Sequence, residues 1–529
     1  MHQKLKSHWF LAIFLLTAIF LRLYNLPELF HFTYDEEIIA FVGKRMWVNQ
    51  HIPLIGGVTP MHVHVAPYFY WFSGFWLGLF SFKPLGWGVV AVGIGVVTLI
   101  SLYTAGVQLF NRRVGLISSI FYTFSFAQNI FDRHYWGLIL DGLWGLLAII
   151  SLHQIIKGNL KYAWVLACIF FFAFHSDPST LVVYILSGLV FVTIHVKPHL
   201  LVASHINKSN TLKVILLISC AFLLSLLPLI IFDIRHGFSN SRGIIQYIEE
   251  LRNPRKGNIA AYPIDTFLFL PRVLARSLYV FGDSDFAKQY SYCANYQKGK
   301  LEAVPNVVTL MIMVILGFAF WKGFKKQRNS TILLFLLFAS TYLGIVIYGI
   351  IFQGDLFDHY VVTILPPFYL LLAFLTDEYR GYKVPVVGVI IIFVALNTSL
   401  LIGAKHRYGY QDKINAVNWA IVETAKKDFS LDVIGDCFKY NGYRYLFWLE
   451  GKEPVKSYVD VNFTHLYDSA PTQTHPSLLV VITNPDETES DEYNKEYIAY
   501  RSKTIKRTTF GRIEVLIVDN SSLQFVGKF

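Results

Sequence analysis

Long apolar stretches, separated by short polar connections, follow one another from the N-terminus to about residue 403. A helix needs about 20 mainly apolar residues to cross a bilayer, and runs of this order recur along the chain. They cover residues 9–21, 85–109, 114–130, 136–153, 162–175, 179–194, 212–232, 305–321, 332–352, 360–375 and 384–403. The pattern predicts a polytopic α-helical membrane protein with about eleven transmembrane helices.

The pattern changes in the last part of the chain, residues 405–529. A helix-like stretch at 411–427 is followed by short apolar runs that are typical of buried strands. These runs lie at 431–434, 478–482 and 513–518. We therefore expect a transmembrane domain at 1–404 and a small C-terminal α/β domain at 405–529.

Composition and charge support a membrane topology. The 529 residues are 54% hydrophobic and only 15% charged, which suits a membrane protein far better than a globular one. The net charge of +11 comes from Lys and Arg clusters in alternate connections, so it reports orientation and predicts no nucleic-acid partner. Because Lys4 and Lys6 precede the first apolar run, we expect a retained anchor, a cytoplasmic N-terminus, external loops at 25–84 and 233–304, and an extracytoplasmic C-terminal domain.

Two smaller features refine this topology. The aromatic run at 67–82 is expected to lie in the membrane interface. The four cysteines have no metal-type spacing, and a disulfide between Cys293 and Cys437, both expected outside, is left open. Low cysteine use and the lack of an organellar signal favour a bacterial or archaeal plasma membrane.

An acidic cluster, Thr33-Tyr34-Asp35-Glu36-Glu37, follows the first apolar run. Thr33 and Glu36 have the spacing of a capping box, and carboxylates are favoured in the first turn of a helix, so Glu36 and Glu37 have a purely structural alternative. Asp35 is not needed for the box. It is our candidate for a general base.

Further polar clusters are expected at the same membrane depth on the external side. They lie at 132–134, 175–178, 233–237 and 355–360 and contain Asp, His and Arg. Any one of them could simply solvate the end of a span. Together they form the kind of lining that a site handling a phosphate and a hydroxyl needs.

The order of several short motifs resembles the GT-C superfamily of membrane glycosyltransferases, and most of all its family-39 type, which contains protein O-mannosyltransferases and lipid A aminoarabinose transferases. The resemblance covers most of residues 9–403. It rests on Arg22-Leu-Tyr-Asn-Leu-Pro27 leading into Tyr34-Asp35-Glu36, then Pro67-Tyr-Phe-Tyr70, Leu109-Phe-Asn-Arg-Arg-Val-Gly115, Arg133 with Trp136, Arg235-His-Gly-Phe238 and His359-Tyr360.

The resemblance implies transfer of a sugar, with inversion, from a polyprenyl-phosphate donor to an extracytoplasmic acceptor hydroxyl on a lipid, a protein or an envelope glycan. Asp35 matches the catalytic aspartate of the family's first external loop, and Glu36 is the second catalytic candidate. Asp132 stands in a context that does not match the acidic residue of some members, so a catalytic role for it is in doubt.

Other residues receive roles from their chemistry. Arginine forks match phosphate oxygens, which makes Arg235 the main phosphate-binding candidate, although it could also be a span-end anchor. The supporting candidates are Arg133, His236 and Arg242 for the phosphate, Tyr68, Tyr70, His175, His359 and Tyr360 for the substrate, and His62 and His64 as weak metal ligands. No cofactor is required by this chemistry, and a divalent metal is left open.

A secondary transporter or flippase is the alternative class. Such a protein should concentrate charged residues near the middle of the membrane and show a repeat between its halves. The sequence shows neither pattern, and its polar clusters gather at the external boundary.

Overall fold

The computed structural model describes residues 2–59, 62–196, 208–252, 263–281, 301, 303–351, 356–405, 409–425, 427–434, 442–460, 476–483 and 491–521. Cys293 and Cys437 lie outside the described residues.

Among the described residues, eight helical segments are long and apolar enough to cross a membrane. They are α5 (Leu85–Leu109), η1 (Gly137–Leu140) with α8 (Asp141–Ile156), η2 (Pro178–Thr180) with α10 (Leu181–Val196), α11 (Lys208–Ser225) with α12 (Leu227–Arg235), α17 (Asn306–Lys326), α18 (Arg328–Val346) with η4 (Ile347–Ile351), η5 (Asp358–Ile364) with α19 (Leu365–Glu378), and α20 (Lys383–Ile402). The prediction of a polytopic helical membrane protein is confirmed.

The three remaining expected runs are also helical but shorter. Two form apolar helices, Ala12–Leu23 within α1 (His2–Leu23) and α9 (Tyr162–Ser176). The run at 114–130 is divided at Ser125 between α6 (Arg112–Phe124) and α7 (Phe126–Phe131). The Ser125 hydroxyl accepts a hydrogen bond from the Gln128 amide at 3.2 Å and so caps the start of α7.

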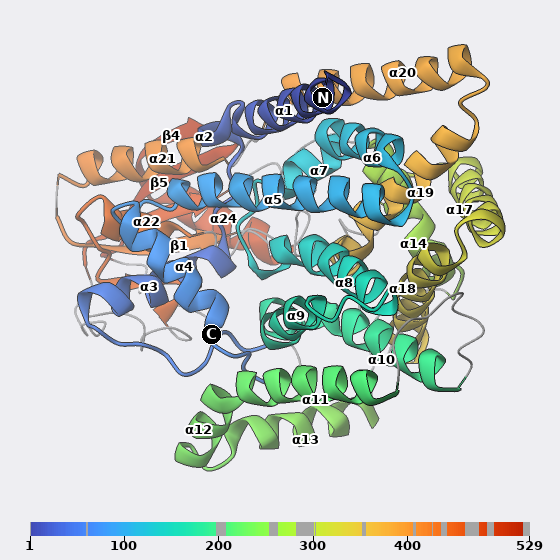
Figure 1. The fold of residues 1–529 in the computed structure, drawn as a ribbon. Helices are drawn as coiled ribbons and strands as arrows, with labels where there is room; N and C mark the ends of the chain where they lie inside the picture. The colour runs from blue at the N-terminus through green and yellow to red at the C-terminus, as the bar shows by residue number, and fades with distance from the viewer. Residues whose placement is uncertain are drawn as a thin grey trace.

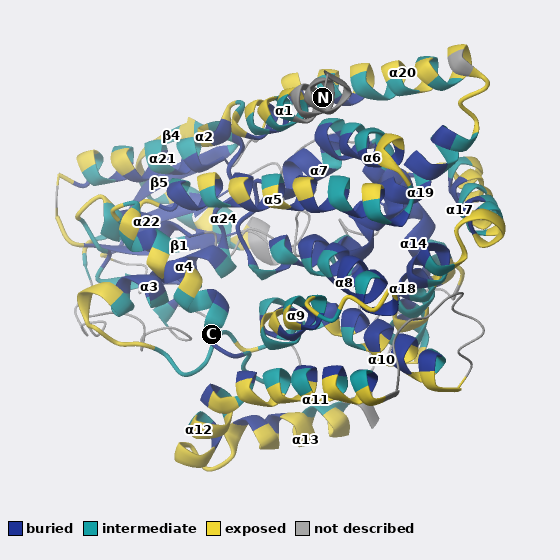
Figure 2. Ribbon diagram, in the orientation of Figure 1, coloured by how far each residue is buried: buried dark blue, intermediate teal, exposed yellow. Residues whose placement is uncertain are grey.

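The helices surround a buried centre (Figure 1). In Figure 2, α8 is largely buried, whereas α11, α17 and α20 expose much of their surface. The exposed residues of these outer helices are mainly Leu, Ile, Val and Met, as expected for helices that face lipid.

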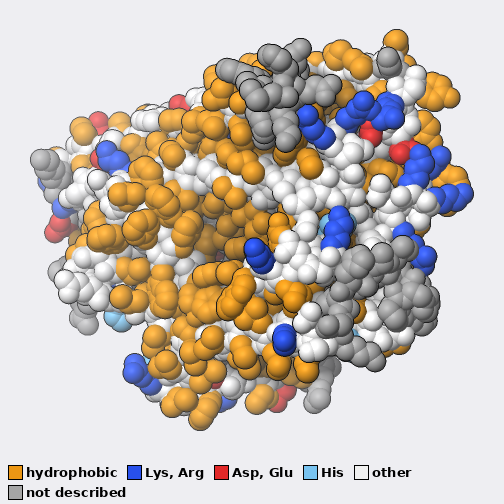
Figure 3. Space-filling model, viewed as in Figure 1, with side chains coloured by type: hydrophobic (Ala, Val, Ile, Leu, Met, Phe, Trp, Pro, Cys, Tyr) orange, Lys and Arg blue, Asp and Glu red, His pale blue; other side chains and the backbone are white. Residues whose placement is uncertain are grey.

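Basic connections that were expected on one side of the membrane meet at one end of the bundle. Asp377 accepts a hydrogen bond from Asn111 Nδ2 at 2.8 Å, and its Oδ1 lies 3.9 Å from Arg113 and 3.5 Å from Arg380. Lys326 pairs with the neighbouring Glu378. Figure 3 shows Lys and Arg side chains gathered at this end, while the C-terminal sheet lies at the opposite side of the molecule in Figure 1.

The C-terminal part forms a five-stranded sheet in the order β2-β1-β3-β5-β4. The strands are β1 (Phe429–Ile434), β2 (Lys456–Ser457), β3 (Leu478–Thr483), β4 (Thr504–Phe510) and β5 (Ile513–Asp519), with helices α21 (Tyr410–Glu423), α22 (Tyr443–Leu449) and α24 (Asp491–Ser502). β1 pairs parallel with β2 and β3, and β5 pairs antiparallel with β3 and β4. The small α/β domain and its three expected strands are confirmed.

Four further helices are not among the eight candidate spans. They are α2 (Leu26–Leu29), α3 (Tyr34–Val48), α4 (Tyr68–Leu79) and α13 (Ser239–Arg252). The 12 residues of α4 rise only about 18 Å, too short to cross a bilayer. A fifth, α14 (Pro263–Leu278), lies within the stretch expected as an external loop and instead packs against α7, α17 and α18.

Candidate functional site

The start of α3 has the capping box that the sequence predicted. The Thr33 amide and hydroxyl both donate to Glu36 Oε2, at 2.9 and 2.8 Å. This reciprocal contact fixes the first turn of α3 and thereby the direction of the next carboxylates.

The three consecutive carboxylates face different surroundings. Glu36 and Glu37 are 0% and 2% exposed, whereas Asp35 is only partly buried. Asp35 is therefore accessible to solvent, whereas Glu36 and Glu37 are buried in the interior. Tyr70, on α4, lies near Asp35. Burial raises the pKa of the Tyr70 phenol, and the negative charge of Asp35 raises it further.

Glu36 joins α3 to the connection between α7 and η1. His134 Nε2 lies 2.5 Å from Glu36 Oε1, with both side chains buried. Burial opposes ionisation of Glu36, but the contacts with His134 and Thr33 outweigh it and lower the pKa of this carboxyl. The His134 ring stacks on Trp136 with centroids 4.0 Å apart, and Trp136 meets His359 edge-on at 4.9 Å. A path of direct contacts thus runs from α3 to η5.

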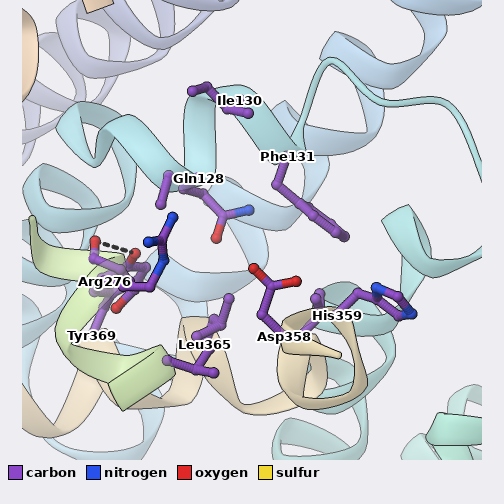
Figure 4. A pocket seen from close by; sticks show the side chains of 12 residues that line it. Gln128, Ile130, Phe131, Arg276, Asp358, His359, Leu365 and Tyr369 are labelled. Atoms are coloured by element: carbon purple, nitrogen blue, oxygen red, sulfur yellow. Dashed lines mark hydrogen bonds between the residues drawn. The ribbon is translucent and has the colours of Figure 1, made fainter. Parts of the chain in front are cut away.

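A cavity lies at the end of this path (Figure 4). Its walls come from α7, α14, η5 and α19, and its polar lining residues are Gln128, Arg276, Ser277, Asp358, His359 and Tyr369. In Figure 4 the side chains of Gln128, Arg276 and Asp358 point toward the same space. Arg276 is 5% exposed, so the cavity wall holds a guanidinium group that is nearly removed from water.

Arg133 lies beside this path, but its hydrogen bonds go to the end of α1. It is fully buried and donates to the carbonyl oxygens of Leu21, Arg22 and Tyr24 at 2.6 to 3.0 Å. These carbonyls belong to the end of α1, where helical partners run out. The geometry gives Arg133 a structural task at the end of α1, and its expected contact with a phosphate stays a prediction.

Asp132 is held in a buried ion pair. Arg22 Nη2 lies 2.7 Å from its Oδ2, which also accepts from the Tyr122 hydroxyl at 2.9 Å. Gln128 Nε2 donates to the other oxygen, Oδ1, at 2.8 Å. Both carboxylate oxygens are thus engaged, which agrees with the doubt that the sequence raised about a catalytic Asp132. Through Gln128 this ion pair also supports the cavity wall.

Tyr68 and His175 are brought together at the break between α11 and α12. The Tyr68 hydroxyl donates to the Ser225 carbonyl at 3.0 Å, and His175 Nε2 lies 2.8 Å from Ser225 Oγ. The two rings are 5.5 Å apart. They form one polar contact between α4, α9 and α11, separate from the cavity.

Arg235, His236 and Arg242 gather at the corner between α12 and α13, and all three are exposed. The corner is shaped by Asp233, which accepts from the Asn240 amide at 2.7 Å and from the Ser241 amide and hydroxyl. The corner touches the loop between α3 and α4, where the His64 amide donates to Asn240 Oδ1 at 2.9 Å.

The two candidate metal-ligating histidines have protein partners. His62 Nε2 lies 3.0 Å from Glu250 Oε2, and His64 Nδ1 lies 3.0 Å from the Gly56 carbonyl. Within the part of the chain that the structure describes, no group of three or more His, Cys, Asp or Glu could hold a metal ion. Both histidines are thus engaged by protein groups, and their role as metal ligands stays a prediction.

No protein-family model and no curated protein matches the sequence. The fold, however, is similar to solved membrane proteins. ArnT from Cupriavidus metallidurans, bound to undecaprenyl phosphate, has a TM-score of 0.51 and 12% identity over 97% of this chain and 98% of that one. The oligosaccharyltransferase AglB from Archaeoglobus fulgidus, in complex with an inhibitory peptide and a dolichol-phosphate, has a TM-score of 0.53 and 10% identity over 99% and 75%.

A structure of the Archaeoglobus fulgidus oligosaccharyltransferase with Zn and sulfate has a TM-score of 0.53 and 10% identity, over 90% of this chain and 68% of that one. Both proteins belong to the GT-C superfamily, so the expected GT-C fold is confirmed. The likeness does not single out the family-39 type.

Sequence reasoning named His359 and the cluster that contains Asp358, but it missed the other polar residues of the cavity wall. Arg276 lies in a stretch expected as a loop, and Gln128 and Tyr369 lie in expected spans. One signal was available: 263–278 has apolar residues at helical spacing with Arg272 and Arg276 four residues apart, which places both arginines on one face of a helix.

Proposed function

We propose that the protein is an inverting glycosyltransferase that moves a sugar from a polyprenyl-phosphate donor to an acceptor hydroxyl outside the cytoplasm. One observation carries the proposal: contacts through Glu36, His134 and Trp136 connect the start of α3 to the wall of the cavity. These contacts therefore link the solvent-accessible carboxylate of Asp35 to the cavity that holds the buried guanidinium group of Arg276. The GT-C fold supports the reaction class, and the lipid phosphates bound by ArnT and AglB support the class of donor.

Asp35 acts as the general base in this proposal. Its carboxylate takes the proton of the acceptor hydroxyl while the hydroxyl oxygen attacks the anomeric carbon of the donor. The bond from that carbon to the phosphate oxygen breaks, and the polyprenyl phosphate leaves with the electron pair. Because attack and departure occur on opposite faces of the sugar, the configuration inverts. In this proposal Tyr70 contacts the acceptor or the sugar, and the effect of the Asp35 charge on the pKa of its phenol supports that role.

Arg276 binds the departing phosphate in this proposal. A buried guanidinium group stabilises developing negative charge more strongly than an exposed one, because water does not screen it. Gln128 and Asp358 point toward the same space and can hydrogen bond to sugar hydroxyls, with His359 at the same wall. Tyr360, the next residue, contacts the His359 ring, with centroids 4.8 Å apart. The exposed corner group, Arg235 with His236 and Arg242, is the competing phosphate site.

Glu36 takes a positioning role. Its oxygens already contact Thr33 and His134, so it holds the first turn of α3 and orients Asp35 instead of receiving the proton. Tyr68 and His175 similarly hold α4, the helix that carries Tyr70, against α9 and α11.

An apolar hollow near the cavity suits the isoprenoid chain. It is lined by residues of α20 and the end of α6, namely Phe124, Val394, Ala395, Thr398, Ser399 and Ile402. Asn397 of α20 accepts from the Phe126 amide at 2.9 Å and donates to the Leu278 carbonyl at 2.8 Å, which ties this helix to α7 and α14 of the cavity wall.

The proposed location is a plasma membrane, with the N-terminus in the cytoplasm and the C-terminal domain outside. The gathering of basic connections around Asp377 and Glu378 at the end opposite the sheet supports this orientation. The acceptor class stays open among lipid, protein and envelope glycan.

The test is sugar transfer from labelled polyprenyl-phosphate sugars in membranes that contain the protein or its Asp35→Asn variant. We expect turnover to fall by roughly 10²- to 10⁴-fold, the range of a general base, with the folded fraction unchanged. Glu250→Gln, an exposed carboxylate on α13, is the matched control. Transfer at the wild-type rate by Asp35→Asn would remove the proposed base.

The same membranes test the alternative class. If sealed vesicles accumulate the lipid-linked or free substrate and no glycosylated product forms with any acceptor class, the protein is a transporter or flippase.

A further inference from the structure

The C-terminal domain forms hydrogen bonds with the chain just before Asp35. The Lys413 ammonium group, on α21, donates to the carbonyl oxygen of Phe32, and the Tyr410 amide donates to the carbonyl of Phe30 at 3.2 Å. Lys413 is 1% exposed, so this is a buried contact between parts of the chain 381 residues apart.

The same domain also forms hydrogen bonds with the chain just after Asp35. Glu37 Oε1 accepts a hydrogen bond from the Tyr445 amide at 2.9 Å, and Oε2 lies 3.4 Å from the Tyr458 hydroxyl. Arg444, the residue before Tyr445, is buried and bound to Ser457 Oγ at 2.9 Å within the domain. Residues 32 and 37 are thus held from the same side, three positions before and two positions after Asp35.

Close packing leaves little freedom at this junction. A Cβ at Gly442, whose φ is 82°, would lie 2.6 Å from the Phe32 ring, and one at Gly409 would lie 1.9 Å from the Glu28 carbonyl. The Phe32 ring also contacts Tyr410 and Tyr445, with centroids 6.2 and 5.9 Å apart. The backbone of the domain therefore sits directly on the segment that leads into α3.

We infer that the C-terminal domain is a positioning element of the reaction site, in which Lys413 and Glu37 fix the chain on both sides of Asp35. The inference rests on the proposed function for its catalytic consequence, though its structural part does not. It assigns the domain a task other than selecting an acceptor. Positioning matters because a general base displaced by about 1 Å can lose 10²-fold in rate.

Because Glu37 and Lys413 are both buried, losing either contact should cost more than the hydrogen bond itself. Burial raises the pKa of Glu37 to about 7, although Tyr445, Arg444 and Lys413 oppose the shift. Burial lowers the pKa of Lys413 to about 7, although Glu36 and Glu37 oppose it. Removing one partner leaves the others buried without compensation, a larger loss than the contact alone.

The experiment uses the full-length protein in nanodiscs and two variants, Lys413→Met and Glu37→Gln. Lys413→Met keeps much of the side-chain bulk but removes the donor, and Glu37→Gln keeps an oxygen that can accept from Tyr445. We expect amide exchange in residues 33–40 to quicken at least tenfold in Lys413→Met and less in Glu37→Gln, with 85–109 unchanged. Turnover should fall about tenfold in Lys413→Met, with the donor KM within twofold, because the donor's cavity is intact.

Asp428→Asn is the matched control, since Asp428 forms an exposed ion pair with Lys452 in the same domain. It should match the wild type in exchange and turnover. Unchanged exchange of 33–40 in Lys413→Met overturns the inference whatever the activity. Quickened exchange with wild-type turnover overturns it as well. If the wild-type protein transfers no sugar, the proposed function fails while the exchange measurement still decides whether the domain holds α3.

To separate positioning from general instability, Glu37→Ala is compared with Glu37→Gln. If the contact with the Tyr445 amide matters, glutamine should restore turnover to within about threefold of the wild type, whereas alanine should not. Equal losses in both variants, with both folded, contradict the role given to Glu37.

Discussion

The start of α3 and the corner between α12 and α13 are both rich in charged residues, yet their charges have different surroundings. Near α3, Glu36, Glu37 and His134 are almost fully buried and share partners with distant segments. At the corner, Arg235 and Arg242 are exposed. Buried polar groups cannot turn to water, so their geometry is fixed before a substrate arrives, which is what electrostatic catalysis needs. The contrast favours the α3 side as the reaction site.

Stability should differ most sharply between a buried ion pair beside α3 and the exposed corner. Arg22→Met leaves Asp132 as a buried charge without its cation, and breaking such a pair costs about 3–5 kcal/mol. Arg235→Met, at the exposed end of α12, should change stability by about 0.5 kcal/mol or less. Thermal unfolding of both variants in the same detergent measures the difference. A similar melting temperature for the two would contradict the distinction between buried and exposed charges.

Turnover should separate the two arginine groups. Arg276→Gln removes the buried guanidinium group from the cavity wall, and we expect kcat/KM for the lipid-linked donor to fall about 100-fold, as for loss of one strong electrostatic donor. Arg235→Gln should change kcat/KM by less than about threefold because water screens its charge. The opposite ranking, a large loss in Arg235→Gln alone, would move the phosphate site to the corner.

Local patterns in the sequence predict much of the fold. The apolar runs reappear as helices because lipid requires every backbone group to be paired within its own segment. The capping box at Thr33 and Glu36 is equally local, since its partners are three residues apart. The strands at 429–434, 478–483 and 513–519 were visible because each contains a short apolar stretch, which is longest in 478–483.

Features that depend on distant partners were not visible in the sequence. β4 has an exposed, polar edge with Lys506 and Arg507, so it lacks the apolar run of its neighbours. The contact of Glu37 with Tyr445 joins residues 408 positions apart, and no spacing rule reports it. For the same reason Arg235 and Arg276 could not be ranked: the two residue types are identical, and only burial distinguishes them.

The smallest expected effect concerns pH. Because burial raises the pKa of Glu37 from 4.5 to about 7, the folded state binds more protons than the unfolded state between these values. Its contribution to stability therefore declines as pH rises through this window. Glu37→Gln removes the proton exchange, so its melting temperature relative to the wild type should rise by a few degrees from pH 5 to pH 8.

Lys413, Arg444, Tyr445 and Tyr458 face Glu37 and are present in both proteins. Because the Glu37 charge also acts on the pKa of Lys413, the difference between the two melting curves reports the pair of Glu37 and Lys413. Asp428→Asn is the counterpart from an exposed carboxylate, because Asp428 pairs with Lys452 and not with a histidine. Its melting temperature relative to the wild type should stay constant over the same pH range. A constant difference for Glu37→Gln would mean that Glu37 keeps one charge state throughout, and that the contact with the C-terminal domain forms without any cost of burying that charge.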